Sequence, residues 1–309
     1  MEHKWLAHQS AAEAIDSKAS PNTCAQDNKL NYKFFDAEGQ TGSACDRPAP
    51  SELGKWKIFV LNLNRATDRL AHMEAMLNRL NLQYERIAAV DGEELSSANI
   101  TRLSSPRVFY WLFGRSMSRG ELGCALSHRV AYQRILDEEL DWALILEDDV
   151  ELSSQIGRWL ASVIHNTNNF DVTQLYFSEN RFHPVKCIAK SDGIRIVSFT
   201  GPHASAVAYV VRRRGAQKLL RFRKAFLPAD KFIWMTALNN IEFCGCLDYL
   251  ARPHCTLNAA SNIDRVDQIL RHSGRHEGKL ALWKLLVRPV VLLGRKLLVL
   301  RTHCRSPMS

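Results

Sequence analysis

Apolar residues occur along the middle of the chain in short runs and at helical spacing, and this pattern predicts alternating strands and helices. Residues 56–63 (WKIFVLNL) form an apolar run rich in strand formers. Residues 84–90 (YERIAAV) predict a second strand that ends at the turn pair Asp91-Gly92. Between the two runs, four apolar positions recur at helical spacing: Leu70, Met73, Leu77 and Leu80. The pattern therefore predicts a β-α-β unit.

A helix is predicted to begin at Ser118, because Ser118 and Glu121 have the spacing of a capping box. Three apolar residues are expected on one face of this helix, with His128 on its flank: Leu122, Leu126 and Val130.

Residues 142–146 (WALIL) resemble a buried parallel strand, and the run stops at three acids, Glu147, Asp148 and Asp149. Later strands are expected over residues 174–177, 195–199 and 206–211, followed by a helix over 214–222. This alternation indicates an α/β fold with a mostly parallel sheet flanked by helices.

Three regions follow from composition. Residues 1–52 are polar and broken by prolines, which predicts a poorly ordered N-terminal extension. Residues 53–270 carry the strand and helix pattern and form the predicted catalytic domain, and residues 271–309 form a basic tail. The first residues lack the apolar core of a secretory signal, so we expect a cytoplasmic protein.

The tail carries most of the chain's formal charge of +9. Nine lysines and arginines lie in it against one acid, Glu277. Its apolar stretch, residues 280–300, is interrupted by charges and by Pro289, so it lacks the uncharged length that a membrane-spanning helix needs. A basic stripe opposite a leucine-rich face predicts an amphipathic helix, which either lies on the inner face of an anionic membrane or packs on the core.

The chain has eight cysteines, and in a reducing compartment we expect free thiols. Four possible zinc ligands cluster in the sequence without matching a standard spacing: Cys244, Cys246, His254 and Cys255.

Three consecutive carboxylates repel one another unless they are solvated or a cation offsets their charge. Acids at a strand end are often the solvated start of a loop. However, ligands of open α/β sheets bind beyond the carboxyl ends of the strands, where a hard divalent cation can hold a diphosphate. This position favours a metal site at residues 147–149.

Several segments together resemble glycosyltransferase family 25, which includes lipopolysaccharide and lipooligosaccharide galactosyltransferases and glucosyltransferases. The resemblance spans residues 55–265. The segments occur in the expected order: residues 58–69 (IFVLNLNRATDR), Asp91-Gly92, 118–128 (SRGELGCALSH), 144–150 (LILEDDV), 208–216 (AYVVRRRGA), and Pro228 with Asp230. Residues 201–203 (GPH) depart from the family pattern, and the tail lies outside it.

This resemblance implies a GT-A-like fold, a UDP-galactose or UDP-glucose donor, a lipid-linked glycan acceptor and inversion at the anomeric carbon. It also implies a divalent metal, Mn²⁺ or Mg²⁺. Asp149 and then Glu147 are the implied metal ligands, and Asp148 the group that reaches the ribose.

Inversion requires a base on the acceptor side of the sugar, and Asp230 is the candidate. Its alternative role is to cap a helix predicted near residues 232–238. Arg65 and Arg69 follow the first strand and either contact the nucleotide or form a solvated helix face. His128 is a site residue or a core histidine, and Asp91 lies by the nucleotide or only forms the turn.

Four other functions compete with this interpretation. The tail does not favour a nucleic acid partner, because its basic residues alternate with Leu and Val and its only aromatic is Trp283. A metal-dependent phosphohydrolase would need a second cluster of His and Asp ligands, which the sequence lacks. A membrane-binding protein without catalysis, or an inactive family member that acts as a scaffold, is consistent with the same residues.

Overall fold

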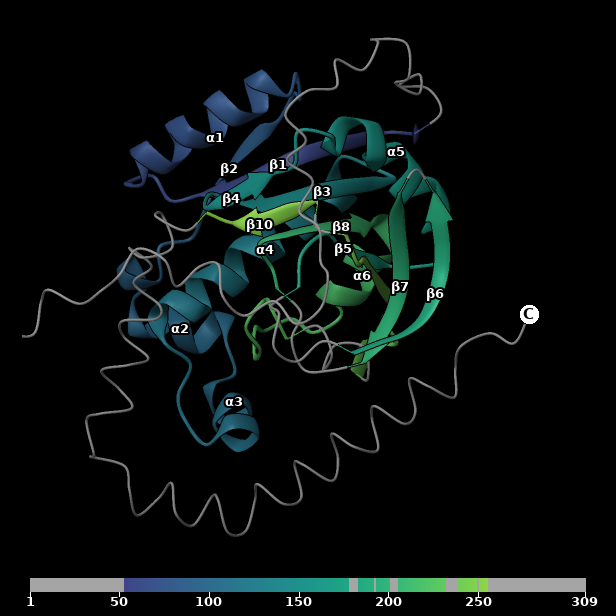
Figure 1. Ribbon diagram of the computed structural model, residues 1–309. Helices are drawn as coiled ribbons and strands as arrows, with labels where there is room; N and C mark the ends of the chain where they lie inside the picture. Colours follow the sequence, from purple (N-terminus) through teal and green to yellow (C-terminus); the bar gives the residue numbers. More distant parts are fainter. Residues whose placement is uncertain are drawn as a thin grey trace, which may run out of the picture. The chain divides into compact units, whose positions relative to one another are not determined.

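A mixed eight-stranded sheet forms the centre of the fold, and helices cover both of its faces (Figure 1). The computed structural model describes residues 53–177, 183–191, 193–200, 205–231, 238–248 and 250–254. The strands of the large sheet are β1 (Trp56–Asn62), β2 (Glu85–Ala88), β3 (Trp142–Glu147), β5 (Val172–Gln174), β6 (His183–Ser191), β7 (Ile194–Thr200), β8 (Ala208–Arg212) and β9 (Phe243–Cys246). A separate pair consists of β4 (Val150–Leu152) and β10 (Ala251–Pro253).

The helices are α1 (Thr67–Arg79), α2 (Ser97–Leu103), α3 (Pro106–Phe113), α4 (Arg119–Asp137), α5 (Ile156–Asn166) and α6 (Arg213–Leu220). A short 3₁₀ turn, η2 (Gly92–Glu94), follows β2. Within the described residues, no helix is both long and apolar enough to span a bilayer.

The large sheet has the order β2-β1-β3-β8-β5-β9-β7-β6. The strands β1, β2 and β3 are mutually parallel, whereas β8 is antiparallel to both β3 and β5. Tracing the pairings across the sheet shows that only β8 and β7 oppose the common direction among the described strands. The prediction of a mostly parallel sheet therefore holds for strand direction, although the pairing is mixed.

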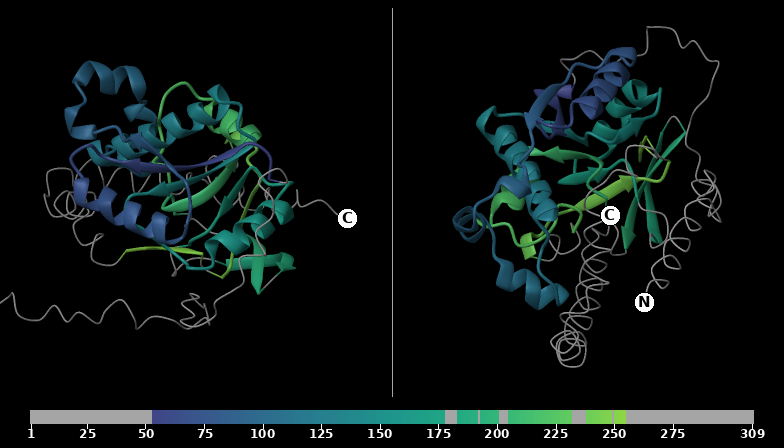
Figure 2. Two further views of the ribbon diagram at one scale, coloured as in Figure 1. Left: turned by 90° about the horizontal axis from the view of Figure 1, so that it is seen from above. Right: turned by 90° about the vertical axis from the view of Figure 1, so that its left-hand side faces the viewer.

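Alternate residues of β3 pack on opposite faces of the sheet, as the period of a strand requires. Leu144 belongs to a core shared with α1 and α5, and Ile145 to a core shared with α4 and α6. Figure 2 shows these helix pairs on opposite sides of the sheet. Since β3 is buried on both faces, its apolar run continues without polar interruption up to the acids.

The start of α4 is fixed against the turn that follows β2. Ser118 and Glu121 form the predicted capping box, and Ser127 accepts a hydrogen bond from the backbone N–H of Val90. A Cβ atom on Gly123 would lie 2.6 Å from the carbonyl oxygen of Val90 and 2.8 Å from the amide nitrogen of Gly92. The absence of a side chain at residue 123 therefore allows α4 to approach this turn.

Most predicted elements are present, with three corrections. Val130 does not share the buried face of α4 with Leu122, because it is 39% exposed and the line of buried residues turns towards Ala131 instead. The strand expected at 174–177 lies at Val172–Gln174, where it pairs with β8 and β9. The helices α2, α3 and α5 and the strands β4, β6, β9 and β10 were not predicted.

Several other predictions fall on residues that the structure does not describe. They concern the extension over 1–52, the amphipathic tail over 271–309, and the helix near 232–238. The three domain boundaries remain predictions.

We expect Gly123→Ala to lower the free energy of unfolding by about 1–3 kcal/mol, because the added methyl group meets backbone atoms that cannot yield without moving α4. Chemical denaturation measures the change. Gly157→Ala in α5 is the matched control, because a Cβ atom there meets nothing within 4 Å, and we expect this variant to be neutral or stabilised by up to about 1 kcal/mol. Equal effects at both glycines would contradict the close approach.

Candidate active site

The three acids lie at the carboxyl end of β3, where the first strands of the sheet end together. Glu147 is the last residue of β3, and Asp148 and Asp149 form the turn into β4. The neighbouring strand β1 ends at Asn62 in the same direction. On the other side, β8 begins at this edge, because it is antiparallel to β3 and Ala208 pairs with Leu146.

Asp148 is held by two neighbours from the β1-α1 segment. Asn62 Nδ2 donates a hydrogen bond of 2.8 Å to Asp148 Oδ2, and Arg69 NH1 donates one of 3.0 Å to Oδ1. Asn62 is itself oriented by Arg86, whose Nε donates to Asn62 Oδ1 at 3.0 Å. Both carboxylate oxygens of Asp148 are therefore partnered, and the Arg69 guanidinium is fixed beside the acids.

Asp149 has a buried oxygen that lacks a partner. The residue is 8% exposed, and Oδ1 accepts no hydrogen bond from any residue that the structure describes. Its other oxygen, Oδ2, lies 3.7 Å from Arg69 NH1. Burial, followed by the charge of Glu147, raises the pKa of Asp149 to about 7. A buried carboxylate oxygen without a donor is costly, and a divalent cation would relieve that cost.

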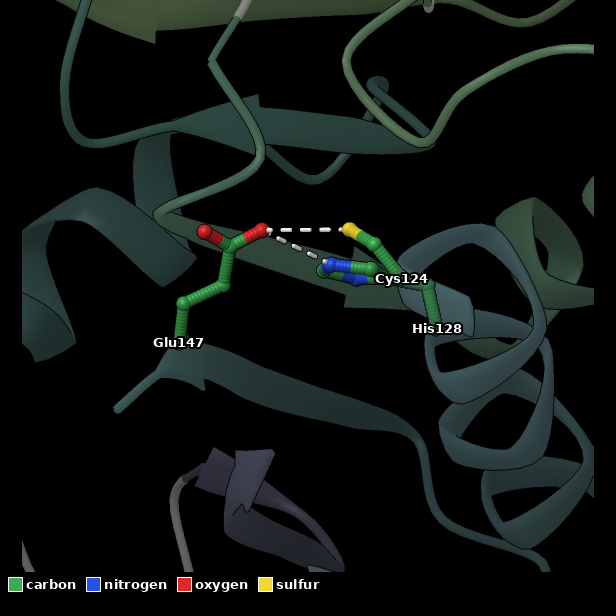
Figure 3. Close-up of side chains that lie close together, drawn as sticks. All are labelled: Cys124, His128 and Glu147. Carbon is green, nitrogen blue, oxygen red and sulfur yellow. Dashed lines mark hydrogen bonds and ion pairs between the residues drawn. The ribbon is translucent and has the colours of Figure 1, made fainter. Parts of the chain in front are cut away.

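The Glu147 side chain points to the side opposite Asp148 and Arg69, towards α4 (Figure 3). Its Oε1 lies 3.1 Å from His128 Nε2 and 3.7 Å from Cys124 Sγ. His128 and Cys124 are one helical turn apart on α4 and so face the same way. Burial and the negative charge of Glu147 raise the pKa of the Cys124 thiol well above its usual value.

Two tyrosines extend the contact between Glu147 and His128 into the core. His128 Nδ1 lies 2.5 Å from the hydroxyl of Tyr209 on β8, which lies 2.8 Å from the hydroxyl of Tyr132 on α4. Burial raises the pKa of both phenols, so they stay neutral. A chain in which Tyr132 donates to Tyr209, Tyr209 to His128 and His128 to Glu147 satisfies every partner.

The remaining predicted site residues form two ion pairs. Arg65 pairs with Asp91, which also caps η2 by accepting a hydrogen bond from the Glu93 N–H. Asp230 pairs with Lys231. The charge of Asp230 also raises the pKa of Cys124, which places Asp230 at the same end of α4 as the acid cluster.

The structure thus brings together Arg69, Asp148 and Asp149 on one side of the β3 end, and Glu147 with His128 on the other. Because Glu147 and Asp148 are consecutive in the chain, the two groups share one edge of the sheet.

Sequence reasoning missed three polar residues of this site: Asn62, Tyr209 and Gln174. Gln174 pairs with Tyr209 across β5 and β8 and donates a hydrogen bond from Nε2 to the Ser205 carbonyl oxygen. Its buried Oε1 has no hydrogen-bond partner in the described part of the chain. Each of the three is a lone polar residue inside an apolar run, and this was the signal that the sequence offered.

The structure gives no support to a zinc site around residues 244–255. Cys244 and Cys246 are fully buried on β9 in the core shared with α1 and α5, and Cys244 contacts Thr173. Cys255 lies outside the described residues. Among the described residues, the group of cysteine, histidine and acidic side chains close enough to share a metal ion is Cys124, His128 and Glu147.

The sequence that carries these residues matches a family of known proteins. Residues 55–233 match the sequence model described as Glycosyltransferase family 25 (LPS biosynthesis protein), and this match covers more than half of the chain. The chain belongs to glycosyltransferase family 25. The matched range contains every candidate site residue from Arg65 to Asp230.

Curated family 25 proteins are similar to this chain over part of their length. Procollagen galactosyltransferase 2 of Homo sapiens is 30% identical over 197 residues, which cover 60% of this chain and 30% of that protein. Procollagen galactosyltransferase 1-B of Xenopus laevis is 26% identical, with 60% and 32% covered. Inactive glycosyltransferase 25 family member 3 of Homo sapiens is 30% identical, with 67% and 38% covered. The chain spans about a third of the length of these relatives.

Among solved structures, mannose-1-phosphate geranyltransferase from Thermus thermophilus is 10% identical to this chain, with a TM-score of 0.36 over 64% of it and 76% of the other chain. A likeness at this level supports no inference about the site.

The raised pKa of Asp149 has a consequence for stability in metal-free protein. The folded state holds the Asp149 proton more tightly than the unfolded chain does. The protonated carboxyl therefore contributes fully to the free energy of unfolding below about pH 4, and this contribution is lost as the pH rises through about 7. In the presence of chelator, we compare the free energy of unfolding of Asp149→Asn with that of the wild type. We expect this difference to shift in favour of the variant by about 2 kcal/mol when the pH is raised from 5 to 8. Denaturant titrations at both pH values measure this gain.

Asp137→Asn is the control, because Asp137 is an exposed aspartate at the end of α4. We expect its stability difference from wild type to be the same at both pH values. A difference for Asp149→Asn that does not change with pH would contradict the raised pKa.

Proposed function

We propose that this chain is a metal-dependent, inverting glycosyltransferase that moves galactose or glucose from a UDP-sugar to a hydroxyl of a glycan acceptor. The observation that carries the proposal is the buried, unpartnered Oδ1 of Asp149, in a carboxylate crowded by Glu147 at the carboxyl edge of the sheet. Membership of family 25 supplies the reaction class, and the acid cluster supplies a site suited to a diphosphate-bound cation.

The arrangement of the sheet is consistent with a GT-A-like fold, which we include in the proposal. The strands β1, β2 and β3 are parallel and end at one edge, where the acids follow β3 directly. In sheets of this kind, ligands bind beyond the carboxyl ends of the strands. The nucleotide is therefore assigned to the edge formed by Asn62, the acids and the turn at Asp91.

Each acid has a separate role in this proposal. Asp149 and Glu147 hold the divalent cation, Mn²⁺ or Mg²⁺, because Asp149 offers an unpartnered oxygen and Glu147 raises its pKa from nearby. Such a cation neutralises the charge that develops on the leaving diphosphate. Asp148 is oriented by Asn62 and Arg69 and is assigned to the ribose hydroxyls.

Two arginines complete the nucleotide site. Arg69 lies beside Asp148 and Asp149 and supplies a positive charge next to the proposed diphosphate position. Arg65 is paired with Asp91, and together they are assigned to the nucleoside. His128 fixes the orientation of Glu147 through its Nε2 atom and so acts through Glu147.

Asp230 is the proposed general base. An in-line displacement requires a carboxylate that removes the proton of the acceptor hydroxyl on the face opposite the leaving group. The charge of Asp230 reaches Cys124, so this carboxylate lies near the acid cluster without belonging to it. Lys231 forms an ion pair with Asp230.

The acceptor is assigned to the lipopolysaccharide or lipooligosaccharide class. The description of the matching family supports this class, and the basic amphipathic pattern of residues 271–309 supports a location at an anionic membrane surface on its cytoplasmic side. The relatives named procollagen galactosyltransferases make a collagen-type peptide the second acceptor to test.

An inactive scaffold is the competing function, since one similar human relative is described as inactive. The presence of all three acids and of the buried, unpartnered Asp149 oxygen favours activity, because a scaffold gains nothing from their repulsion.

The first test is release of UDP from UDP-galactose and UDP-glucose with Mn²⁺, which needs no knowledge of the acceptor. We expect turnover in the wild type and a loss of about 100-fold to 1000-fold in kcat/KM for Asp149→Ala, because cation stabilisation of the leaving group is worth several kcal/mol. Asp137→Asn is the control and should match the wild type. Equal turnover by Asp149→Ala would reject the metal assignment.

The second test concerns the tail, whose structure is not described. Truncation after Ile269 removes nine basic residues, and we expect it to lower binding to anionic vesicles by more than about tenfold, because each basic residue near such a surface contributes roughly 1 kcal/mol. Vesicle co-sedimentation measures the change, with zwitterionic vesicles as the control. Binding that survives truncation would show that another surface contacts the membrane.

A further inference from the structure

The contact between Glu147 and α4 contains the ligand set of a softer metal than the one assigned to the acid cluster. Cys124 offers a thiol sulfur, His128 an imidazole nitrogen and Glu147 a carboxylate oxygen, and these atoms all lie within 4.8 Å of one another. Sulfur and imidazole ligands favour zinc, whereas sites made only of oxygen favour Mg²⁺ and Mn²⁺. The acids and this trio therefore differ in the metal that they select.

Two of the separations between the ligand atoms are close to those of a tetrahedral zinc site, and the third is within 4.8 Å. With Zn–S near 2.3 Å and Zn–N or Zn–O near 2.0 Å, tetrahedral angles place sulfur and oxygen roughly 3.5 Å apart and nitrogen and oxygen roughly 3.3 Å apart. The observed values are 3.7 Å from Cys124 Sγ to Glu147 Oε1 and 3.1 Å from His128 Nε2 to the same oxygen. Little movement is needed for the three atoms to surround one ion (Figure 3).

The structure also supplies the surroundings that a zinc site needs. The hydroxyl of Tyr209 contacts His128 Nδ1 and so holds the ring with Nε2 towards Glu147, which is the usual arrangement behind a metal-bound histidine. Tyr132 supports Tyr209 in turn. Cys124 is partly exposed and the Glu147 side chain is 26% exposed, so an ion can enter while His128 stays buried.

We propose that Cys124, His128 and Glu147 form a zinc site that shares Glu147 with the cation site of the acid cluster. The thiol loses its proton to solvent on binding, and the sulfur donates an electron pair to the ion. The histidine proton shifts from Nε2 to Nδ1, which then donates a hydrogen bond to the Tyr209 hydroxyl, and Tyr209 in turn donates to Tyr132. Water takes the fourth position.

Sharing Glu147 makes zinc an inhibitor of sugar transfer, and this part of the inference rests on the proposed function. An ion held by the trio occupies Glu147 Oε1 and adds a positive charge beside the second cation site. Both effects weaken the binding of Mn²⁺ at Asp149. Zinc binding itself does not depend on whether the protein transfers a sugar.

The binding test uses the full-length protein after chelator treatment, with Zn²⁺ titrated against a chromophoric chelator. We expect Cys124→Ser to lose the tight zinc site, so that it binds one Zn²⁺ fewer per chain and its affinity at this site falls by more than about 100-fold. We expect the zinc affinity of Tyr209→Phe to fall by about 10-fold to 100-fold. Cys187→Ser is the matched control, because Cys187 is an exposed free cysteine outside the trio. Co²⁺ should give a thiolate charge-transfer band in the wild type and in Cys187→Ser that is lost in Cys124→Ser.

A measurement on the wild type alone covers the case in which Cys124→Ser fails to fold. Zn²⁺ should slow alkylation of Cys124, mapped by mass spectrometry, and leave that of Cys187 unchanged. Equal zinc binding by the wild type and a folded Cys124→Ser protein, or alkylation of Cys124 that zinc does not slow, would overturn the site.

The transfer assay separates this inference from the proposed function. With Mn²⁺ and UDP-galactose present, micromolar Zn²⁺ should reduce turnover in the wild type and in Cys187→Ser, and the ratio of turnover with and without Zn²⁺ should return towards one in Cys124→Ser. Turnover that zinc leaves unchanged in the wild type overturns the inhibition and leaves the proposed function intact. Zinc binding without any turnover supports the site and rejects the proposed function.

Discussion

Repulsion among three consecutive carboxylates is the constraint on which the site depends. The buried strand β3 delivers Glu147, Asp148 and Asp149 to one point, and the fold must distribute their charge. It does so by sending the side chains apart: Asp148 to Asn62 and Arg69, and Glu147 to His128. Asp149 lies beside Arg69, with a buried oxygen that no described residue satisfies.

The two sides of this arrangement have different chemistry. The side towards α1 carries an arginine and an asparagine, which suit oxygen ligands and phosphates. The side towards α4 carries a thiol, an imidazole and two neutral phenols, which suit a softer metal. Glu147 stands between these environments, so the occupancy of one side is coupled to the other. This coupling links the proposed transfer chemistry to the proposed inhibition by zinc.

The parts of the fold that were predictable are those with a strong local pattern. The apolar run at 142–146, the capping box at Ser118 and the helical spacing after β1 each specified an element correctly. The strand β9 was missed because Gly245 and its two cysteines give a weak strand pattern. The helix α5 was missed although its buried residues have regular helical spacing: Ile156, Trp159, Leu160, Val163 and Ile164. Val130 was misplaced because four-residue spacing alone drifts around a helix as long as α4.

The site was predictable only in part for a related reason. The acids and His128 could be identified from their positions in two segments. However, the contact between Glu147 and Cys124 joins residues 23 positions apart, and that between Asp148 and Asn62 joins residues 86 apart. Such pairs arise from the register of β1 on β3 and the packing of α4, which no local pattern encodes.

The proposed sugar transfer depends on a divalent cation bound by Asp149 and Glu147 at the end of β3. A crystal soaked with Mn²⁺ and UDP, measured for the anomalous scattering of manganese, tests it most directly. The account predicts a manganese peak within coordination distance of Asp149 Oδ1 and a carboxylate oxygen of Glu147, with the diphosphate on its open side. A manganese peak elsewhere, or a diphosphate bound at this edge without metal contact to Asp149, would contradict it.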